Sequence, residues 1–238
     1  MKIFGTAKGG ALSKKDFGVA FGGGELEPTY ETDFSSASDW DKTGTSQEIS
    51  SGSLNYDSVP NNSNQSISHT LDSAASDTAY VLRYKDTIDQ FVQNSGQEQF
   101  IFMGLSSADD STGGGSNQDY LMLTYQIDAS KDNIANMDCD NQSPSNQGQS
   151  LEYDKFTTGL STTTFYPEHT RLSATSFKIE LDYTSPTEAV TRTIPSNVQS
   201  LQYIKLQNRA DGSTAASTDI NGKLDDLKFY DNVTSVWN

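Results

Sequence analysis

Residues 176–183 read SFKIELDY, and this stretch decides the fold class. Its apolar residues alternate with charged ones, which is the period of two expected for a strand with one buried and one solvent-facing side. The apolar face comprises Phe177, Ile179, Leu181 and Tyr183, and the charged face comprises Lys178, Glu180 and Asp182. The stretch is therefore predicted to be a β-strand in a sheet that covers a core on one side.

Similar short runs recur from about residue 25 onward, separated by turns rich in Ser, Asn, Asp and Gly, with no sustained helical period. Some runs, such as 100–105, are apolar on both faces, as in central strands that are enclosed on both sides. Ten or more strands without intervening helices predict an all-β fold, a two-sheet antiparallel jelly-roll sandwich. The other strands are expected at 30–34, 45–49, 66–71, 79–88, 97–105, 119–127, 190–194, 201–207 and 223–230.

Long polar loops are expected between these strands, at 57–65, 106–118, 128–150 and 210–222. His169 follows Pro167 in the segment YPEHTR, and we expect it in an exposed turn.

Composition excludes several classes of protein. The chain has 16 Lys and Arg against 32 Asp and Glu, and its net charge of −16 disfavours nucleic acid and anionic membranes as partners. No apolar run approaches the roughly 20 residues that span a bilayer, so no membrane insertion is expected. Cys139 is the only cysteine, which excludes an intrachain disulfide framework and a multi-cysteine zinc site.

The first 24 residues differ in charge from the rest of the chain. Four lysines and one aspartate give them +3, which leaves −19 for residues 25–238. We predict an extended basic, glycine-rich arm over 1–27 and one sandwich domain over 28–238. The arm has too few apolar residues for a core of its own, so it is either a flexible tail or it is ordered on an acidic neighbouring copy. The expected subunit-contact residues are Phe4, Lys8, Lys14, Lys15, Phe17 and Phe21.

Four segments carry a resemblance to a known family. They are DFSSASDW at 33–40, GSLNY at 52–56, LQYIKLQNR at 201–209 and GKLDDLKFY at 222–230. Together they resemble the concanavalin A-like lectin/glucanase superfamily, specifically the laminin-G-like jelly-roll modules of cell-surface and viral proteins. The resemblance covers about residues 28–238. It implies that the first and last strands pair, often with a calcium ion near their meeting point.

The last strand also indicates a cation site by its own pattern. Leu224 has even parity while Leu227 and Phe229 have odd parity, so a bulge is expected at Asp225-Asp226. A bulge turns a carboxylate out of the ladder, where a hard cation such as Ca²⁺ takes oxygen ligands. The alternative is that these are surface carboxylates beside lysines. The candidate calcium ligands are Asp33, Asp39, Asp225 and Asp226.

Sugar binding is a second candidate chemistry, because lectin-like sandwiches use aromatic rings and a few polar groups. The aromatic residues available for it are Trp40, Tyr56, Tyr120, Tyr125, Tyr153, Tyr166 and Trp237, each of which has core packing as its alternative role. Of these, Trp40, Tyr120 and Tyr125 are the glycan-binding candidates.

Catalysis is not expected. Glycosidases need two carboxylates flanking the scissile bond, and the nearest match, Glu180 with Asp182, shares its face with Lys178 as the solvent side of a strand does. The chain also has no Gly-x-Ser-x-Gly elbow.

Two functions follow from these patterns. The first is a non-enzymatic structural subunit of an extracellular or viral assembly, such as a capsid, decoration, fibre or filament, whose arm contacts neighbouring subunits in a homo-oligomer. The alternative is a calcium-stabilised carbohydrate-binding module for cell-surface or environmental glycans. Both place the protein on an extracellular surface or a virion.

Overall fold

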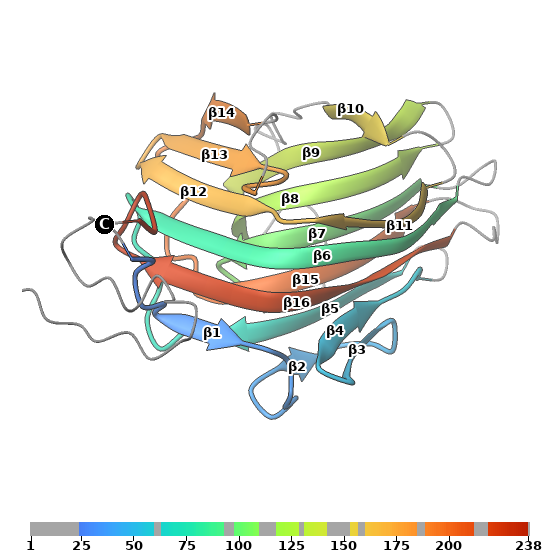
Figure 1. The fold of residues 1–238 in the computed structure, drawn as a ribbon. Helices are drawn as coiled ribbons and strands as arrows, with labels where there is room; N and C mark the ends of the chain where they lie inside the picture. The colour runs from blue at the N-terminus through green and yellow to red at the C-terminus, as the bar shows by residue number, and fades with distance from the viewer. Residues whose placement is uncertain are drawn as a thin grey trace, which may run out of the picture.

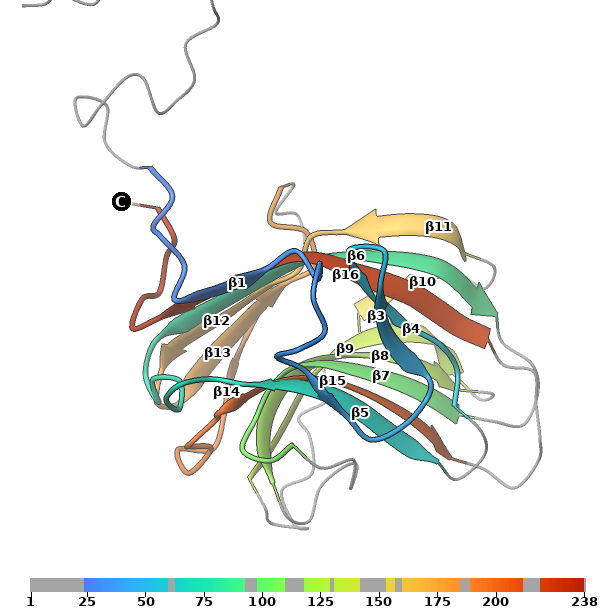
Figure 2. The ribbon, with the colours of Figure 1, turned by 90° about the horizontal axis from the view of Figure 1, so that it is seen from below.

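The computed structural model describes residues 24–59, 63–92, 98–109, 118–128, 131–141, 153–156, 160–184, 189–211 and 219–237. Within these ranges all regular structure is β, in sixteen strands that form two sheets. Strands within each sheet pair antiparallel, and the sheets lie face to face as two layers (Figure 2). The predicted class, an all-β two-sheet antiparallel sandwich, is confirmed.

The larger sheet faces the viewer in Figure 1, with β6 and β16 through its middle. Its order is β14 (Ala189–Thr193), β13 (Ser176–Glu180), β12 (Glu168–Ser173), β6 (Tyr80–Val92), β16 (Asp219–Asp231), β4 (Ser53–Tyr56) and β3 (Gln47–Ser50). Two more strands complete its nine: β1 (Tyr30–Thr32) pairs with β16, and β11 (Leu160–Phe165) pairs with β6.

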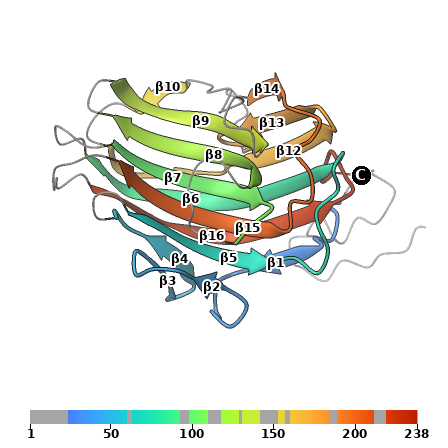
Figure 3. The same ribbon diagram turned by 180° about the vertical axis from the view of Figure 1, so that it is seen from behind.

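The smaller sheet has seven strands and faces the viewer in Figure 3, where the molecule is seen from behind. Its order is β10 (Tyr153–Phe156), β9 (Lys131–Asn141), β8 (Asp119–Asp128), β7 (Glu98–Ser106), β15 (Tyr203–Asp211), β5 (Asn64–Thr70) and β2 (Asp41–Lys42).

One apolar core fills the space between the sheets, built from alternate residues of the long central strands. Leu82 and Ile88 of β6, Leu121 and Leu123 of β8, and Leu206 of β15 belong to it, each at most 2% exposed. Burying a side chain of this size contributes roughly 1.5–3 kcal/mol to stability. This core therefore holds the two sheets together.

The core also encloses a group of polar side chains. The carboxylate of Asp86, which is 1% exposed, accepts a hydrogen bond of 2.9 Å from Tyr56 Oη. Burial raises the pKa of Asp86 to about 7, although hydrogen bonds from Tyr125 and Tyr56 oppose the shift. His169 is fully buried, and its burial lowers its pKa to about 3.

The bulge expected in the last strand is present. The pairing of β16 with β6 shifts register between Asp225 and Lys228, and Asp226 has a positive φ of 50°. β4 pairs with β16 before the bulge, at 222–224, and β1 pairs after it, at 227–229. The pairing of the first strand with the last is confirmed as well, and the bulge separates the two strands that share one edge of β16.

Three expectations need correction. The segment 128–150 is not one loop, because β9 lies within it and pairs with β8. Residues 219–222, expected in a loop, are the beginning of β16. His169 is not in an exposed turn but in β12, where β6 and β13 flank it on either side and leave it 0% exposed.

No helix among the described residues is long and apolar enough to cross a membrane.

Candidate functional site

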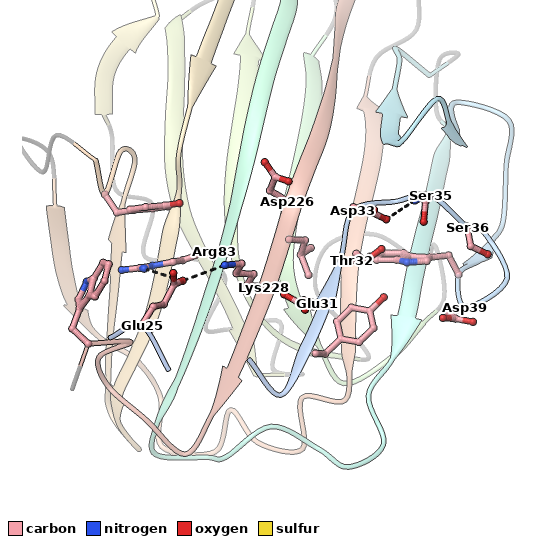
Figure 4. Close-up of a pocket in the computed structure, with 15 residues that line it drawn as sticks. Glu25, Glu31, Thr32, Asp33, Ser35, Ser36, Asp39, Arg83, Asp226 and Lys228 are labelled. Atoms are coloured by element: carbon pink, nitrogen blue, oxygen red, sulfur yellow. Dashed lines mark hydrogen bonds and ion pairs between the residues drawn. The ribbon is translucent and has the colours of Figure 1, made fainter. Parts of the chain in front are cut away.

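A cleft of about 740 Å³ lies on the larger sheet where β1 meets β16 (Figure 4). β1 contributes its own residues and the turn that follows it, and β16 contributes Asp226, Leu227 and Lys228 beside the bulge. β6 contributes Arg83, and the C-terminal segment contributes Trp237. The wall therefore comes from segments that are far apart in the sequence.

The C-terminal segment is held against the chain before β1. Glu25 and Trp237 form an isolated antiparallel bridge, and Leu26 N donates a 2.8 Å hydrogen bond to Val236 O. Val236 is 1% exposed and packs with Val81 and Tyr230. This anchoring positions the indole of Trp237, which is 52% exposed, beside the cleft.

One end of the cleft is built around Arg83. Its Nη2 lies 2.5 Å and its Nε 2.6 Å from Oε2 of Glu168, on the neighbouring strand β12. Its guanidinium lies 4.3 Å from the centre of the Tyr183 ring and 5.6 Å from that of Trp237. Guanidinium groups stack favourably on aromatic rings, so Arg83 fixes these two rings as one unit.

Glu25 links this end to the middle of the cleft. Its Oε1 accepts a hydrogen bond of 2.5 Å from Tyr230 Oη and lies 3.5 Å from Lys228 Nζ and 3.7 Å from Arg83 Nη1. Burial by itself raises the pKa of Glu25, but the Tyr230 hydrogen bond and the two cations outweigh it and lower the pKa. Glu25 is therefore ionised at neutral pH and neutralises the cations beside it.

The other end carries carboxylates on the turn after β1. Asp33 accepts a 2.9 Å hydrogen bond from the backbone N–H of Ser35, and hydrogen bonds from Ser35 lower the pKa of Asp33. Asp39 Oδ1 accepts a 2.9 Å hydrogen bond from Ser38 Oγ. Figure 4 shows Asp33 and Asp39 at this end, and Glu31 and Asp226 nearer the middle of the view, on either side of Lys228.

The turn after β1 is held in place by buried residues and by the ring of His69. Phe34 is 1% exposed in the core and has a positive φ of 55°, which turns the chain inward. The ring of His69 stacks on Tyr30 at 3.8 Å, and its Nδ1 lies 2.9 Å from Asp39 O. Trp40 packs against the same imidazole, with its ring centre 5.7 Å away.

The predicted calcium ligands separate into two groups. Asp33, Asp39 and Asp226 line the cleft, whereas Asp225 accepts a hydrogen bond from Ser53 Oγ and lies 3.3 Å from Lys85 Nζ. Among the described residues no three His, Cys, Asp or Glu side chains gather in a group that could hold a metal ion. The structure thus does not assemble the expected four-aspartate site.

The predicted glycan-contact residues also lie in three places. Trp40 lines the cleft but is only 7% exposed. Tyr125 is in the core between the sheets, 1% exposed. Tyr120 is 6% exposed on the other face of the smaller sheet, where it packs with Phe102 and Met122. Of the three, only Trp40 lies at the cleft.

Three aromatic residues that line the cleft, Tyr30, Tyr183 and Trp237, are not among the glycan-binding candidates predicted from the sequence. Trp237 was among the aromatic residues available for sugar contact, but no feature of the neighbouring sequence distinguished it from the others. Tyr183 was expected on the buried face of its strand. β13 instead ends at Glu180, and the half-buried Tyr183 lies over Arg83. The alternation of residues 176–183 does not show where the strand ends.

The acidic pair considered for catalysis is engaged locally. Glu180 Oε1 lies 2.9 Å from Lys178 Nζ, and Asp182 Oδ1 accepts hydrogen bonds from the backbone N–H and Oγ1 of Thr184 at 2.9 and 2.5 Å. Neither carboxylate lines the cleft.

The predicted subunit contacts Phe4, Lys8, Lys14, Lys15, Phe17 and Phe21 lie outside the described residues. Contact with a neighbouring copy through them stays a prediction, as does the boundary between arm and domain.

No protein-family model matches the chain, and the search of curated proteins found no match. Solved structures do match. The carbohydrate recognition domain of Emp46p, in a potassium-bound form, has a TM-score of 0.57 at 13% identity, covering 88% of this chain and 100% of its own. The CBM2 module of the evolved Dit of Lactobacillus casei BL23 phage J-1 has a TM-score of 0.54 at 13% identity, covering 89% and 98%.

A third match is an enzyme. Alginate lyase Aly36B has a TM-score of 0.51 at 14% identity, covering 80% of this chain and 85% of its own. These likenesses show the fold, a concanavalin A-like jelly-roll sandwich, and the resemblance seen in the sequence is confirmed at that level. Because one neighbour is a lyase, they do not confirm the expected absence of enzymatic activity.

Proposed function

We propose that this chain is a carbohydrate-binding module that acts outside the cytoplasm, and that its binding site is the cleft between β1, β16 and the C-terminal segment. One observation carries the proposal: Trp237 is 52% exposed at the cleft and is held there by its bridge to Glu25 and by Arg83. A large aromatic surface kept in solvent by specific contacts is typical of a binding site.

The other cleft residues supply what a sugar needs. The C–H face of a pyranose packs on an aromatic ring, and its hydroxyl groups donate to carboxylates and exchange hydrogen bonds with serine and threonine hydroxyls. Trp237 and Tyr183 provide the rings at one end, and the turn after β1 provides acidic and hydroxyl groups at the other. Two of the similar folds are named as a carbohydrate recognition domain and a CBM2 module, which supports the same function.

No ion is part of this proposal. The Emp46p structure is a potassium-bound form, but the described residues of this chain do not gather the acidic group that a calcium ion needs.

The test is glycan-array binding by the full chain, followed by titration of each bound glycan with wild type and with Trp237→Ala. Loss of the indole should weaken binding about tenfold or more, as for other central aromatic contacts. The matched control is Leu172→Ala, because Leu172 is 38% exposed and lies away from the cleft. A silent array, or equal affinities for wild type and Trp237→Ala, would contradict the proposal.

Assembly through the basic arm is the second candidate function. The charge split of +3 against −19 favours it, and its test is given in the Discussion.

A further inference from the structure

The charge of the cleft narrows the class of glycan. Five carboxylates and two cations line it, a net charge of −3 on a chain whose total is −16. A charge of one sign along a groove raises the local concentration of ligands of the other sign.

Both cations already have partners. Arg83 forms two short contacts with Glu168, and its guanidinium lies over the ring of Tyr183. Lys228 Nζ lies 3.5 Å from Glu25 Oε1, which is also 3.7 Å from Arg83. An anionic ligand at Arg83 would have to displace Glu168 from a guanidinium that is only 8% exposed in its side chain, whereas the pair of Lys228 with Glu25 is more exposed, at 37% and 33%. Breaking the pair of Arg83 with Glu168 leaves a charge buried without compensation, which is strongly unfavourable.

The remaining carboxylates have no such close contacts, although Glu31 stands opposite Lys228 in the pairing of β1 with β16. Within the described part of the chain, Glu31, Asp33, Asp39 and Asp226 form no salt bridge, although Asp33 and Asp39 accept hydrogen bonds from Ser35 and Ser38. Ionised carboxylates accept hydrogen bonds and donate none. Their preferred ligand groups are donors, and charged donors bind about twice as strongly as neutral ones.

The aromatic end adds no preference for a charged ligand, because the rings of Tyr183 and Trp237 already lie against the guanidinium of Arg83. From this arrangement we infer that the cleft selects a polysaccharide of protonated amino sugars over a neutral glycan and rejects uronate polymers. This inference rests on the proposed function and goes beyond it in naming the ligand class.

The experiment uses three β-1,4-linked hexasaccharides titrated into the full chain at about pH 6, above the pKa of about 4 that Asp and Glu side chains have in model peptides. They are the hexamer of glucosamine, cellohexaose and a hexamer of mannuronate. Glucosamine and glucose units differ only in an ammonium group in place of the 2-hydroxyl, so the pair isolates the charge. We expect the glucosamine hexamer to bind about tenfold more tightly than cellohexaose, with a preference that declines as salt rises, and no binding of mannuronate.

Two double variants carry the same change of net charge. Glu31→Gln with Asp226→Asn removes two cleft carboxylates and should lower the ratio of glucosamine to cellohexaose affinity about threefold or more. Glu48→Gln with Asp72→Asn removes two exposed carboxylates outside the cleft and should leave that ratio unchanged.

The outcomes separate the two proposals. Binding of cellohexaose or mannuronate as tight as that of the glucosamine hexamer, and weakened by Trp237→Ala, would overturn the inference while supporting the proposed function. Equal loss of preference in both double variants would also overturn it, because the effect would then come from net charge alone. If none of the three hexamers binds, the inference is overturned and the glycan array decides the proposed function.

Discussion

The hydroxyl oxygen of Tyr84 lies 3.0 Å from Nε2 of His169 in the space between the two sheets. Tyr84 also lies near Asp86, whose charge raises the pKa of the Tyr84 hydroxyl in addition to the larger effect of burial. The core thus holds a histidine and an aspartate that are both neutral in the folded protein over a range of mildly acidic pH.

These two groups affect the pH dependence of stability with opposite signs. Asp86 has a raised pKa of about 7, so its contribution is present at low pH and is lost as pH rises from about 4 to about 7. His169 has a lowered pKa of about 3, so its contribution is present above about pH 6.5 and is lost as pH falls toward 3. Between these limits the two effects on the free energy of unfolding nearly cancel.

In the variant Asp86→Asn, the pH dependence of stability that comes from His169 should become measurable. With the aspartate gone, the free energy of unfolding should rise between about pH 4.5 and 6.5, relative to wild type, by on the order of 2 kcal/mol. Urea unfolding at a series of pH values measures the difference. Parallel pH profiles for variant and wild type would show that Asp86 does not take up a proton on folding.

His169→Gln should have the opposite effect. The variant loses core packing at every pH, but its free energy of unfolding should decline from about pH 4 to 7 more steeply than that of wild type, because only the Asp86 contribution remains. The slope against pH, rather than the absolute stability, is the readout. A free energy of unfolding that rises with pH in this variant would contradict the raised pKa of Asp86.

Gly222→Ala should disturb the hydrogen bond between Tyr56 and Asp86. A Cβ at this position would lie 2.4 Å from Thr87 O and 2.5 Å from Tyr56 Oη, too close for either atom. We expect a loss of about 1–3 kcal/mol in the free energy of unfolding. The control is Gly24→Ala, where a Cβ would meet no atom within 4 Å. Equal stability of the two variants would be inconsistent with this packing.

Arg83→Met should leave the carboxylate of Glu168, 11% exposed in its side chain, without its cation. Removing one partner of a buried pair costs roughly 3–5 kcal/mol, and replacing both by apolar residues, as in Arg83→Met with Glu168→Leu, should recover much of it. Lys178→Met serves as the control, because its pair with Glu180 is more exposed and should contribute less than about 1 kcal/mol. Similar melting curves for both single variants would contradict the prediction.

Deletion of residues 1–24 tests the assembly prediction. The shortened chain should fold as wild type does, because the two sheets and their core lie within the retained residues. If the arm binds the acidic body of a neighbouring copy, light scattering should show an assembly for the full chain and a monomer for the shortened one. The same particle mass for both would count against a role of the arm in assembly.

Short-range pattern was sufficient for the fold class and for the details that depend on neighbours in sequence. The period of two in 176–183 predicts a strand, because alternate side chains of a strand point to opposite faces. The mismatch in parity between Leu224 and Leu227 predicted the bulge that the structure shows at Asp225 and Asp226. The same reasoning was wrong for His169, because residues 168–171 are all polar and all buried, so no alternation of apolar and polar residues marks β12 as a strand.

The sequence by itself therefore determined that this protein is a sandwich of antiparallel sheets, whose first strand was expected beside its last from the family resemblance. The cleft was decided by the tertiary structure alone. Arg83, Tyr183 and Trp237 meet only because β6 and β12 pair and because the C-terminal segment is bridged to Glu25. Contacts between segments more than 50 residues apart leave no periodic signal in the chain, since alternation reports which face a residue occupies and not what lies across from it.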